Sequence, residues 1–277
     1  MSLDAAPTPA AAAGLLARSR KQRPVRELLC EHVFRPLAHP LVLALLPLRV
    51  PPPAVVAASA AAGVATAVEI GRGQLVLAAL LLQLKTVLDN ADGQLARLSG
   101  RVSVLGRYLD SESDLIVDAA LLAAIGYRTG RPGLAAGAFV VLTFVLSVDF
   151  NLERLYRASR GDVREAMPHG EGRATALCER LYALVYAPQD RLVERVVEWR
   201  LAPLAADGAA RLAYHDRATI AVLANTGLST QLAALGLFLA LGEPTGYCWF
   251  VFACALALVP LFLRRELLAR RSSTTRR

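Results

Sequence analysis

Four aspartates at fixed spacings interrupt two otherwise apolar stretches of this chain, and they limit its possible folds more than any other feature. The pattern is D-x2-D-G-x2-A-R-x8-G-x3-D-x3-D. Its fixed positions are Asp89, Asp92, Gly93, Ala96, Arg97, Gly106, Asp110 and Asp114. The neighbouring residues are apolar enough to lie in a membrane, where each bare carboxylate costs about 2.5–3.5 kcal/mol on the insertion scale. Four carboxylates in that setting need a compensating charge, which divalent metal ions would supply.

The composition is typical of an integral membrane protein. Of the 277 residues 55% are hydrophobic and 19% are charged, and the mean hydropathy is +0.42, whereas soluble domains carry about 25% charged residues. The net charge of +8 comes from arginines clustered between apolar segments, which favours anchoring at an anionic membrane surface. Few aromatic residues accompany these clusters, so we expect no nucleic-acid partner.

Six apolar stretches are long enough to cross a membrane as helices, since a crossing takes about 20 residues. They cover residues 53–71, 74–97, 105–127, 132–150, 218–241 and 244–263. The second and third stretches carry the motif, and small polar residues around Asn225 break the fifth. We therefore predict an all-α integral membrane protein with six transmembrane helices in residues 51–266.

Three segments are predicted to flank this domain. Residues 1–19 are rich in alanine, and we expect them to be disordered. Residues 20–50 mix arginines with leucines, a pattern that predicts an amphipathic helix on the membrane surface before the first span. Residues 267–277 form a basic tail. Only Arg72, Arg128 and Arg131 fall in the predicted outer loops, so the positive-inside rule places both termini and the motif loop on the cytoplasmic side of a multi-pass cytoplasmic-membrane protein.

Residues 151–216 form a long cytoplasmic insertion between the fourth and fifth spans. A helical pattern covers residues 174–201, and we expect Pro188 to interrupt it. Seven apolar residues could form a stripe against the membrane surface or the helix bundle. They are Leu177, Leu181, Leu184, Val185, Leu192, Val196 and Trp199. An interfacial scaffold explains the segment, and a regulatory or acceptor-binding role is the alternative.

Helical periodicity places the acidic residues of each motif segment on one face. One face carries Lys85, Asp89, Asp92 and Ala96, and the other carries Asp110, Asp114 and Asp118. A short turn through Gly100 makes the two segments antiparallel neighbours, so the two faces can meet. Carboxylate oxygens suit Mg²⁺ or Mn²⁺, and paired ions can neutralise a diphosphate. Lys85 is interpreted as a salt-bridge partner, with contact to an acceptor phosphate as the alternative.

The motif resembles the signature of the CDP-alcohol phosphotransferase (CDP-alcohol phosphatidyltransferase) family, and every signature position is filled. Members are integral membrane enzymes with six transmembrane helices, usually homodimers. They transfer a substituted phosphate group from a CDP-linked donor to an alcohol acceptor and release CMP. The resemblance makes residues 51–266 the catalytic domain and implies two divalent ions, Mg²⁺ or Mn²⁺, as cofactors.

The resemblance also implies a role for each motif residue. The implied metal ligands are Asp89, Asp92, Asp110 and Asp114, and Asp114 is implied as the base that deprotonates the acceptor. The residues implied to line the site for the CDP moiety are Gly93, Ala96, Arg97 and Gly106. Glu112 and Asp118 are interpreted as cavity groups near the ligands.

Two questions have alternative answers: which donor is used, and whether the protein is an enzyme. CDP-diacylglycerol is favoured from the family, which makes the reaction a step of phospholipid biosynthesis. Many relatives carry Pro-Asn-x-x-Thr in the first span, whereas here Pro53 is followed by Ala54 and Ala57, so a soluble CDP-alcohol such as CDP-inositol or a CDP-amino alcohol is the runner-up donor. A cation transporter would explain the acidic faces but not the glycines, Ala96 and Arg97 at fixed offsets.

Overall fold

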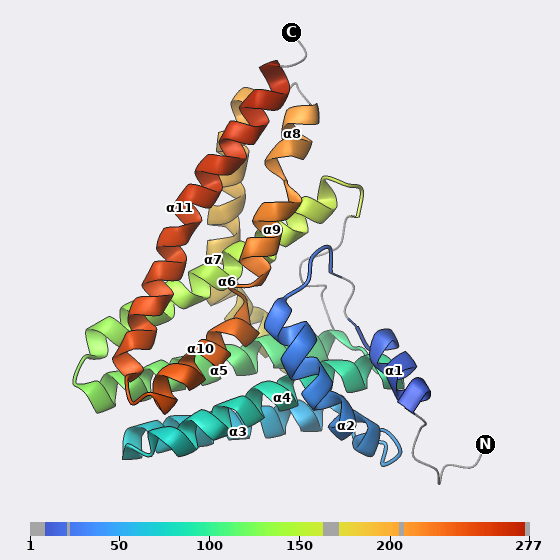
Figure 1. The fold of residues 1–277 in the computed structure, drawn as a ribbon, viewed down its shortest axis with the longest axis vertical. Helices are drawn as coiled ribbons and strands as arrows, with labels where there is room; N and C mark the ends of the chain where they lie inside the picture. The colour runs from blue at the N-terminus through green and yellow to red at the C-terminus, as the bar shows by residue number, and fades with distance from the viewer. Residues whose placement is uncertain (1–8, 21–22, 163–171, 205–207, 275–277) are drawn as a thin grey trace.

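A computed structural model describes the protein over residues 9–20, 23–162, 172–204 and 208–274, and over these ranges it contains helices and no strand (Figure 1). Four segments are long and apolar enough to cross a membrane by length and composition. They are Pro52–Arg72, Pro132–Ala158, Gly208–Ala240 and Pro244–Ser272. The protein is therefore all-α with candidate membrane-spanning helices, as the sequence predicts.

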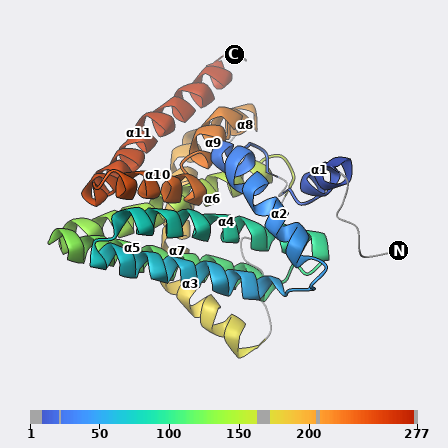
Figure 2. The ribbon, with the colours of Figure 1, turned by 60° about the horizontal axis from the view of Figure 1, so that its bottom comes forward.

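The motif lies in a layer of three helices, α3 (Pro52–Arg72), α4 (Leu75–Ser99) and α5 (Val104–Thr129). Helix α3 packs against both α4 and α5, and Figure 2 shows the three helices lying along one another. Helix α4 ends at Gly100, whose φ of 69° is a left-handed conformation that glycine adopts without strain. This tight ending returns the chain directly into α5.

Helices α4 and α5 have the length of a membrane crossing but not its composition. Each carries several charged residues in the half that holds the motif, so neither appears among the four candidate spans. The prediction of six spans is therefore not confirmed for these two helices, whose charged residues include those of the motif together with Lys85, Glu112 and Asp118.

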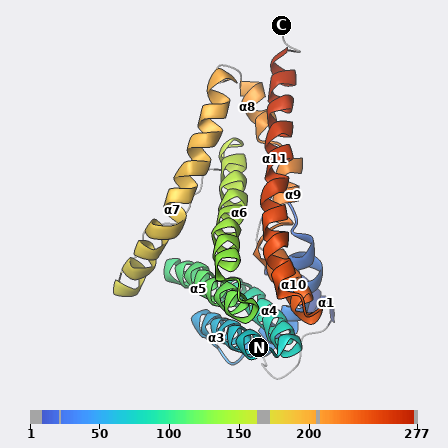
Figure 3. The same cartoon turned by 90° about the vertical axis from the view of Figure 1, so that its left-hand side faces the viewer.

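The other long helices rise from this layer. Helices α6 (Pro132–Ala158) and α11 (Pro244–Thr274) pack against each other, and the shorter α10 (Leu228–Ala240) packs against α4 (Figure 3). The core between them and the layer contains fully buried side chains from each of the helices α3, α4, α5, α6, α10 and α11. Examples, in that order, are Ile70, Leu82, Leu121, Leu142, Leu235 and Val251.

The fifth predicted span is broken, as its polar residues indicate. Helix α9 (Arg217–Ala224) follows the short helix α8 (Gly208–Tyr214) and ends at Asn225, and α10 begins at Leu228. The Asn225 side chain accepts a hydrogen bond from the Leu28 backbone N–H at 2.8 Å. At this break, Asn225 therefore joins the N-terminal segment to the helix bundle.

The helical pattern that covers residues 174–201 of the insertion forms one helix, α7 (Arg173–Leu201), and the prediction that Pro188 interrupts it is wrong. Polar contacts to α6 just after the proline hold the helix in place. Ser147 and Asn151 donate hydrogen bonds to Asp190 at 2.8 and 2.5 Å, and Gln189 donates to Thr143 at 3.2 Å. These contacts offset the loss of one backbone hydrogen bond at the proline.

The predicted apolar stripe of α7 does not pack against the bundle. Leu177, Leu184 and Trp199 are exposed, whereas Val193 and Val197 are buried. The face of α7 that packs against α6 is instead the one that carries Asp190, Val193 and Val197. Asp190 accepts a hydrogen bond from Ser147 of α6, and the two valines are part of the buried core.

The N-terminal segments differ from expectation. Residues 1–8 lie outside the described residues, and helix α1 (Pro9–Arg18) stands where disorder was expected, in keeping with the high helix propensity of alanine. A single surface helix over 20–50 is not confirmed. That segment contains the π-helix η1 (Cys30–Phe34) followed by α2 (Arg35–Leu45), whose buried face packs against α4.

Candidate active site

Three motif aspartates meet between α4 and α5. One carboxylate oxygen each of Asp89, Asp92 and Asp110 lies within 4.8 Å of the others. Asp92 is 5% exposed, and among the described residues its Oδ2 has no hydrogen-bond partner. A buried carboxylate oxygen without a donor is costly, and a bound cation would satisfy it. The oxygen donors present therefore fit a divalent metal ion.

The fourth motif aspartate has a different partner. Nζ of Lys85 on α4 donates a hydrogen bond to Oδ1 of Asp114 on α5 and another to Oδ1 of Asp89 at 3.2 Å. The Lys85 side chain is almost fully buried. The interpretation of Lys85 as a salt-bridge partner is confirmed, and the ion pair joins the two acidic faces across the helices.

A stripe of small residues on α3 sets the height and the spacing of these two helices. Ser59 donates a hydrogen bond to the backbone carbonyl of Lys85 at 3.2 Å. One turn later, Gly63 lies directly against the Val117 side chain of α5. Helix α3 therefore holds α4 at the residue that forms the ion pair and holds α5 one turn beyond Asp114.

Gly93 and Arg97 form a second part of the site on α4. The guanidinium group of Arg97 folds over Gly93, where a Cβ would lie 3.2 Å from both terminal nitrogens. Nε of Arg97 donates a hydrogen bond to the carbonyl of Ser19, which follows α1. Ala96, in the same turn, is half-buried. The N-terminal segment thus contacts the arginine that the family resemblance implies for the CDP site.

Gln94 is a residue that sequence reasoning missed. It is fully buried, and its amide oxygen accepts a hydrogen bond from Ser19 at 3.3 Å and lies 3.3 Å from Nδ1 of His39. Its amide nitrogen donates to the carbonyl of Arg35 at 3.1 Å. A polar side chain inside the motif was the available signal, but its partners are far away in the sequence.

Gly106 lies in the first turn of α5. Its backbone N–H donates a hydrogen bond at 3.0 Å to the side chain of Ser103, the N-cap of the helix. A Cβ at Gly106 would lie 3.0 Å from the same oxygen. The glycine therefore allows a close N-terminal cap one turn before Asp110.

Two further acids on α5 are buried. Asp118 is 5% exposed and follows Asp114 by one turn on the same face. Glu112 is 3% exposed, and helical spacing turns it away from the face of Asp110 and Asp114. Asp118 therefore extends the acidic face, while Glu112 does not belong to it.

Helix α7 adds a tyrosine that the sequence did not identify. Burial raises the pKa of the Tyr186 hydroxyl, and the nearby carboxylates of Asp118 and Asp114 raise it further. The ring of Tyr182, one turn earlier, lies 5.8 Å from that of Tyr186. The insertion therefore brings Tyr186 near the acidic face.

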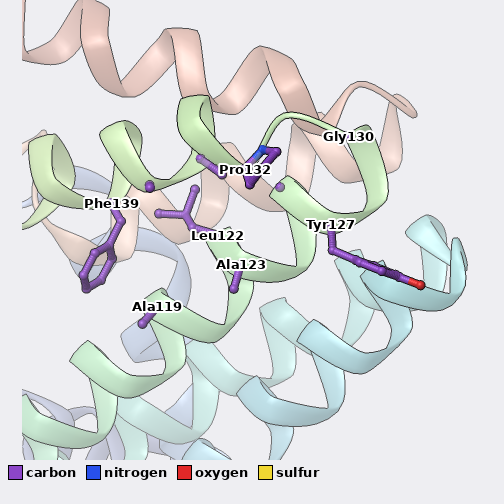
Figure 4. Close-up of a pocket in the computed structure, with 10 residues that line it drawn as sticks. Ala119, Leu122, Ala123, Tyr127, Gly130, Pro132 and Phe139 are labelled. Atoms are coloured by element: carbon purple, nitrogen blue, oxygen red, sulfur yellow. The ribbon is translucent and has the colours of Figure 1, made fainter.

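An apolar pocket in the described part of the chain is separate from this site. It has a volume of about 620 Å³ and lies at the hairpin of α5 and α6, and Figure 4 shows Ala119, Leu122, Tyr127 and Phe139 on its wall. Its lining residues do not include the motif aspartates. The carboxylate cluster, which occupies the opposite half of α5, is the candidate active site.

Comparison with known proteins agrees with this geometry. The family model described as CDP-alcohol phosphatidyltransferase matches residues 39–206, which is more than half of the chain and includes the whole motif. The chain is also 38% identical over 93 residues to a Thermococcus kodakarensis protein described as a bifunctional IPC transferase and DIPP synthase. The matched part is 33% of this chain and 22% of that relative, so the chain spans about a fifth of the relative's length.

Proposed function

The chain belongs to the CDP-alcohol phosphatidyltransferase family, and on that premise we propose that it is a membrane enzyme that transfers a substituted phosphate group from a CDP-linked donor to an alcohol and releases CMP. The observation that carries the proposal is the group of Asp89, Asp92 and Asp110, whose oxygens converge within 4.8 Å. The buried Oδ2 of Asp92 adds support, because a bound cation would satisfy this oxygen.

We propose two divalent ions, Mg²⁺ or Mn²⁺, as cofactors. Asp89, Asp92 and Asp110 would hold the first, and Asp114 would contribute to the second. Bound there, the ions would neutralise the donor diphosphate and polarise the reacting oxygens. Oxygen ligands of this kind suit both metals.

The residues of the chain have separate tasks in the proposed reaction. Asp114 accepts the proton of the acceptor hydroxyl. The oxygen of that hydroxyl then attacks the phosphorus of the group to be transferred. The bond from that phosphorus to the bridging oxygen breaks, and CMP leaves with this oxygen. Arg97 binds donor phosphate with its planar guanidinium group, and Gly93 lets the phosphate approach the helix backbone. Positioning and electrostatics supply the rate enhancement.

We propose CDP-diacylglycerol as the donor, which places the reaction in phospholipid biosynthesis. The four apolar candidate spans support a lipid substrate, because an enzyme embedded in the membrane can take its donor from the bilayer. A soluble donor such as CDP-inositol or a CDP-amino alcohol is the alternative. It would reach the same cluster from the aqueous side.

The test is CMP release by the purified protein in nanodiscs with Mn²⁺ or Mg²⁺. Donors are CDP-diacylglycerol, CDP-inositol and a CDP-amino alcohol, each combined with a panel of alcohols and phosphorylated alcohols. Release with any pair, lost in Asp92→Asn, supports the enzyme. Saturable CDP-diacylglycerol binding separates the enzyme from a cation transporter, which would instead move Mn²⁺ into liposomes without any nucleotide.

We further propose that α4 and α5 also cross the membrane, that residues 20–50 lie at its surface, and that the enzyme is a homodimer. Both termini and the motif loop would face the cytoplasm, where nucleotide donors are made available. The arginine distribution supports this orientation. Labelling of the Arg101→Cys and Arg131→Cys variants in intact cells tests it: only the Arg131→Cys variant should react with an impermeant maleimide.

A further inference from the structure

Lys85 places a positive charge inside the carboxylate cluster. Its side chain is 2% exposed, and its Nζ donates hydrogen bonds to Asp89 at 3.2 Å and to Asp114. Its backbone is also held, because Ser59 donates a hydrogen bond to its carbonyl at 3.2 Å. Breaking a buried ion pair leaves an uncompensated charge, so the ammonium group stays between α4 and α5 when nothing replaces it.

The ammonium group occupies the place of a cation shared by Asp89 and Asp114. Asp89 belongs at the same time to the group with Asp92 and Asp110. A divalent ion in that group and the Lys85 ammonium together offset most of the charge of the four carboxylates. One metal ion and one side chain thus leave a single negative charge on four carboxylates whose charge would otherwise match two divalent ions.

We propose that the Lys85 ammonium takes the place of the second divalent ion in the donor-free protein. That protein then binds one ion, at Asp89, Asp92 and Asp110, and repulsion from the ammonium excludes another. This inference rests on the proposed function, in which two ions act, and adds that the second ion binds together with the donor. The diphosphate of the donor brings the negative charge that a second ion requires. Lys85 is a positioning residue that acts through Asp89 and Asp114.

The experiment counts Mn²⁺ ions bound per protein chain in detergent, without donor, from the electron paramagnetic resonance signal of free Mn²⁺. The wild type should bind one ion. Lys85→Met, which removes the charge and keeps the length of the side chain, should bind two. Lys85→Arg keeps the charge and should bind one, and the double variant with Lys85→Met and Asp114→Asn should return to one.

Two results would overturn the inference: two ions on the donor-free wild type, or one ion on Lys85→Met. The wild-type count decides even if Lys85→Met does not fold. A purely structural lysine would lower the melting temperature of Lys85→Met without changing the number of ions. A wild type that releases CMP but binds two ions without donor keeps the proposed function and refutes this inference alone.

Discussion

Val117 of α5 fills the space in which Gly63 of α3 has no side chain. A Cβ built on Gly63 would lie 2.5 Å from Cγ1 and 2.8 Å from Cγ2 of Val117, closer than nonbonded carbon atoms approach. The same helix α3 bonds to the Lys85 carbonyl through Ser59. The contact between Gly63 and Val117 therefore contributes to the spacing of the acidic faces.

Gly63→Ala should lower stability by about 1–3 kcal/mol, because the added methyl group forces α3 and α5 apart. The measurement is thermal unfolding in detergent. Gly71→Ala on the same helix is the matched control, since nothing lies within 4 Å of its Cβ. The control should be neutral or more stable by about 0.5–1 kcal/mol, from helix propensity. Equal stability of the two variants would contradict the close packing.

Asp114→Asn should reduce CMP release by about 10²–10⁴-fold, the usual contribution of a general base, while the protein stays folded. The amide retains an oxygen that can accept the hydrogen bond from Lys85. Glu112→Gln is the control, because it neutralises another buried acid on a different face of α5. Near-normal turnover of Asp114→Asn would rule out this residue as the base.

Asp92→Asn should remove the stabilisation of the protein by Mn²⁺. Binding to the folded state alone stabilises it by about 2.7 kcal/mol at a ligand concentration about 100 times Kd. Melting temperatures with and without Mn²⁺ measure the effect. Asp118→Asn, which lies outside the three-aspartate group, should keep the full shift. A full shift in Asp92→Asn would show that the ion binds elsewhere.

Gly93→Ala should weaken donor binding without affecting folding. Its Cβ would meet the two terminal nitrogens of Arg97 at 3.2 Å, and the flexible arginine would move away. We expect the KM for the donor to rise about tenfold, which corresponds to about 1.4 kcal/mol. Gly133→Ala, with open space around its Cβ, should leave KM unchanged. An unchanged KM in both variants would show that Arg97 does not bind the donor.

Asp190→Ala should detach α7 from α6, because Ser147 and Asn151 of α6 donate hydrogen bonds to this carboxylate. The expected loss of stability is about 1–3 kcal/mol, since the buried Ser147 hydroxyl remains without its acceptor. Limited proteolysis of α7 and thermal unfolding measure it. Glu198→Ala, on the exposed side of the helix, is the control. Resistance of both variants to the protease would argue against this interface.

Helical periodicity made much of the site predictable. Asp89, Asp92 and Lys85 share one face of α4 at spacings of three and four residues, so their proximity depends on the local chain alone. Pro188 shows where local reasoning fails, because α7 continues through it. The contacts of Gln189 and Asp190 with α6 stabilise that helix, and nothing near Pro188 in the sequence indicates them.

The partner of each carboxylate follows from the packing of helices. The spacing of the motif requires two acidic faces and a compensating cation, because about 3.6 residues complete each turn of any α-helix. It does not distinguish Asp114 from Asp110. Ser59 and Gly63 set the relative height of α4 and α5, and this places Asp110 beside Asp89 and Asp92 and Asp114 against Lys85. These pairings form between helices, where the side chains must fit together and the buried charges must find partners.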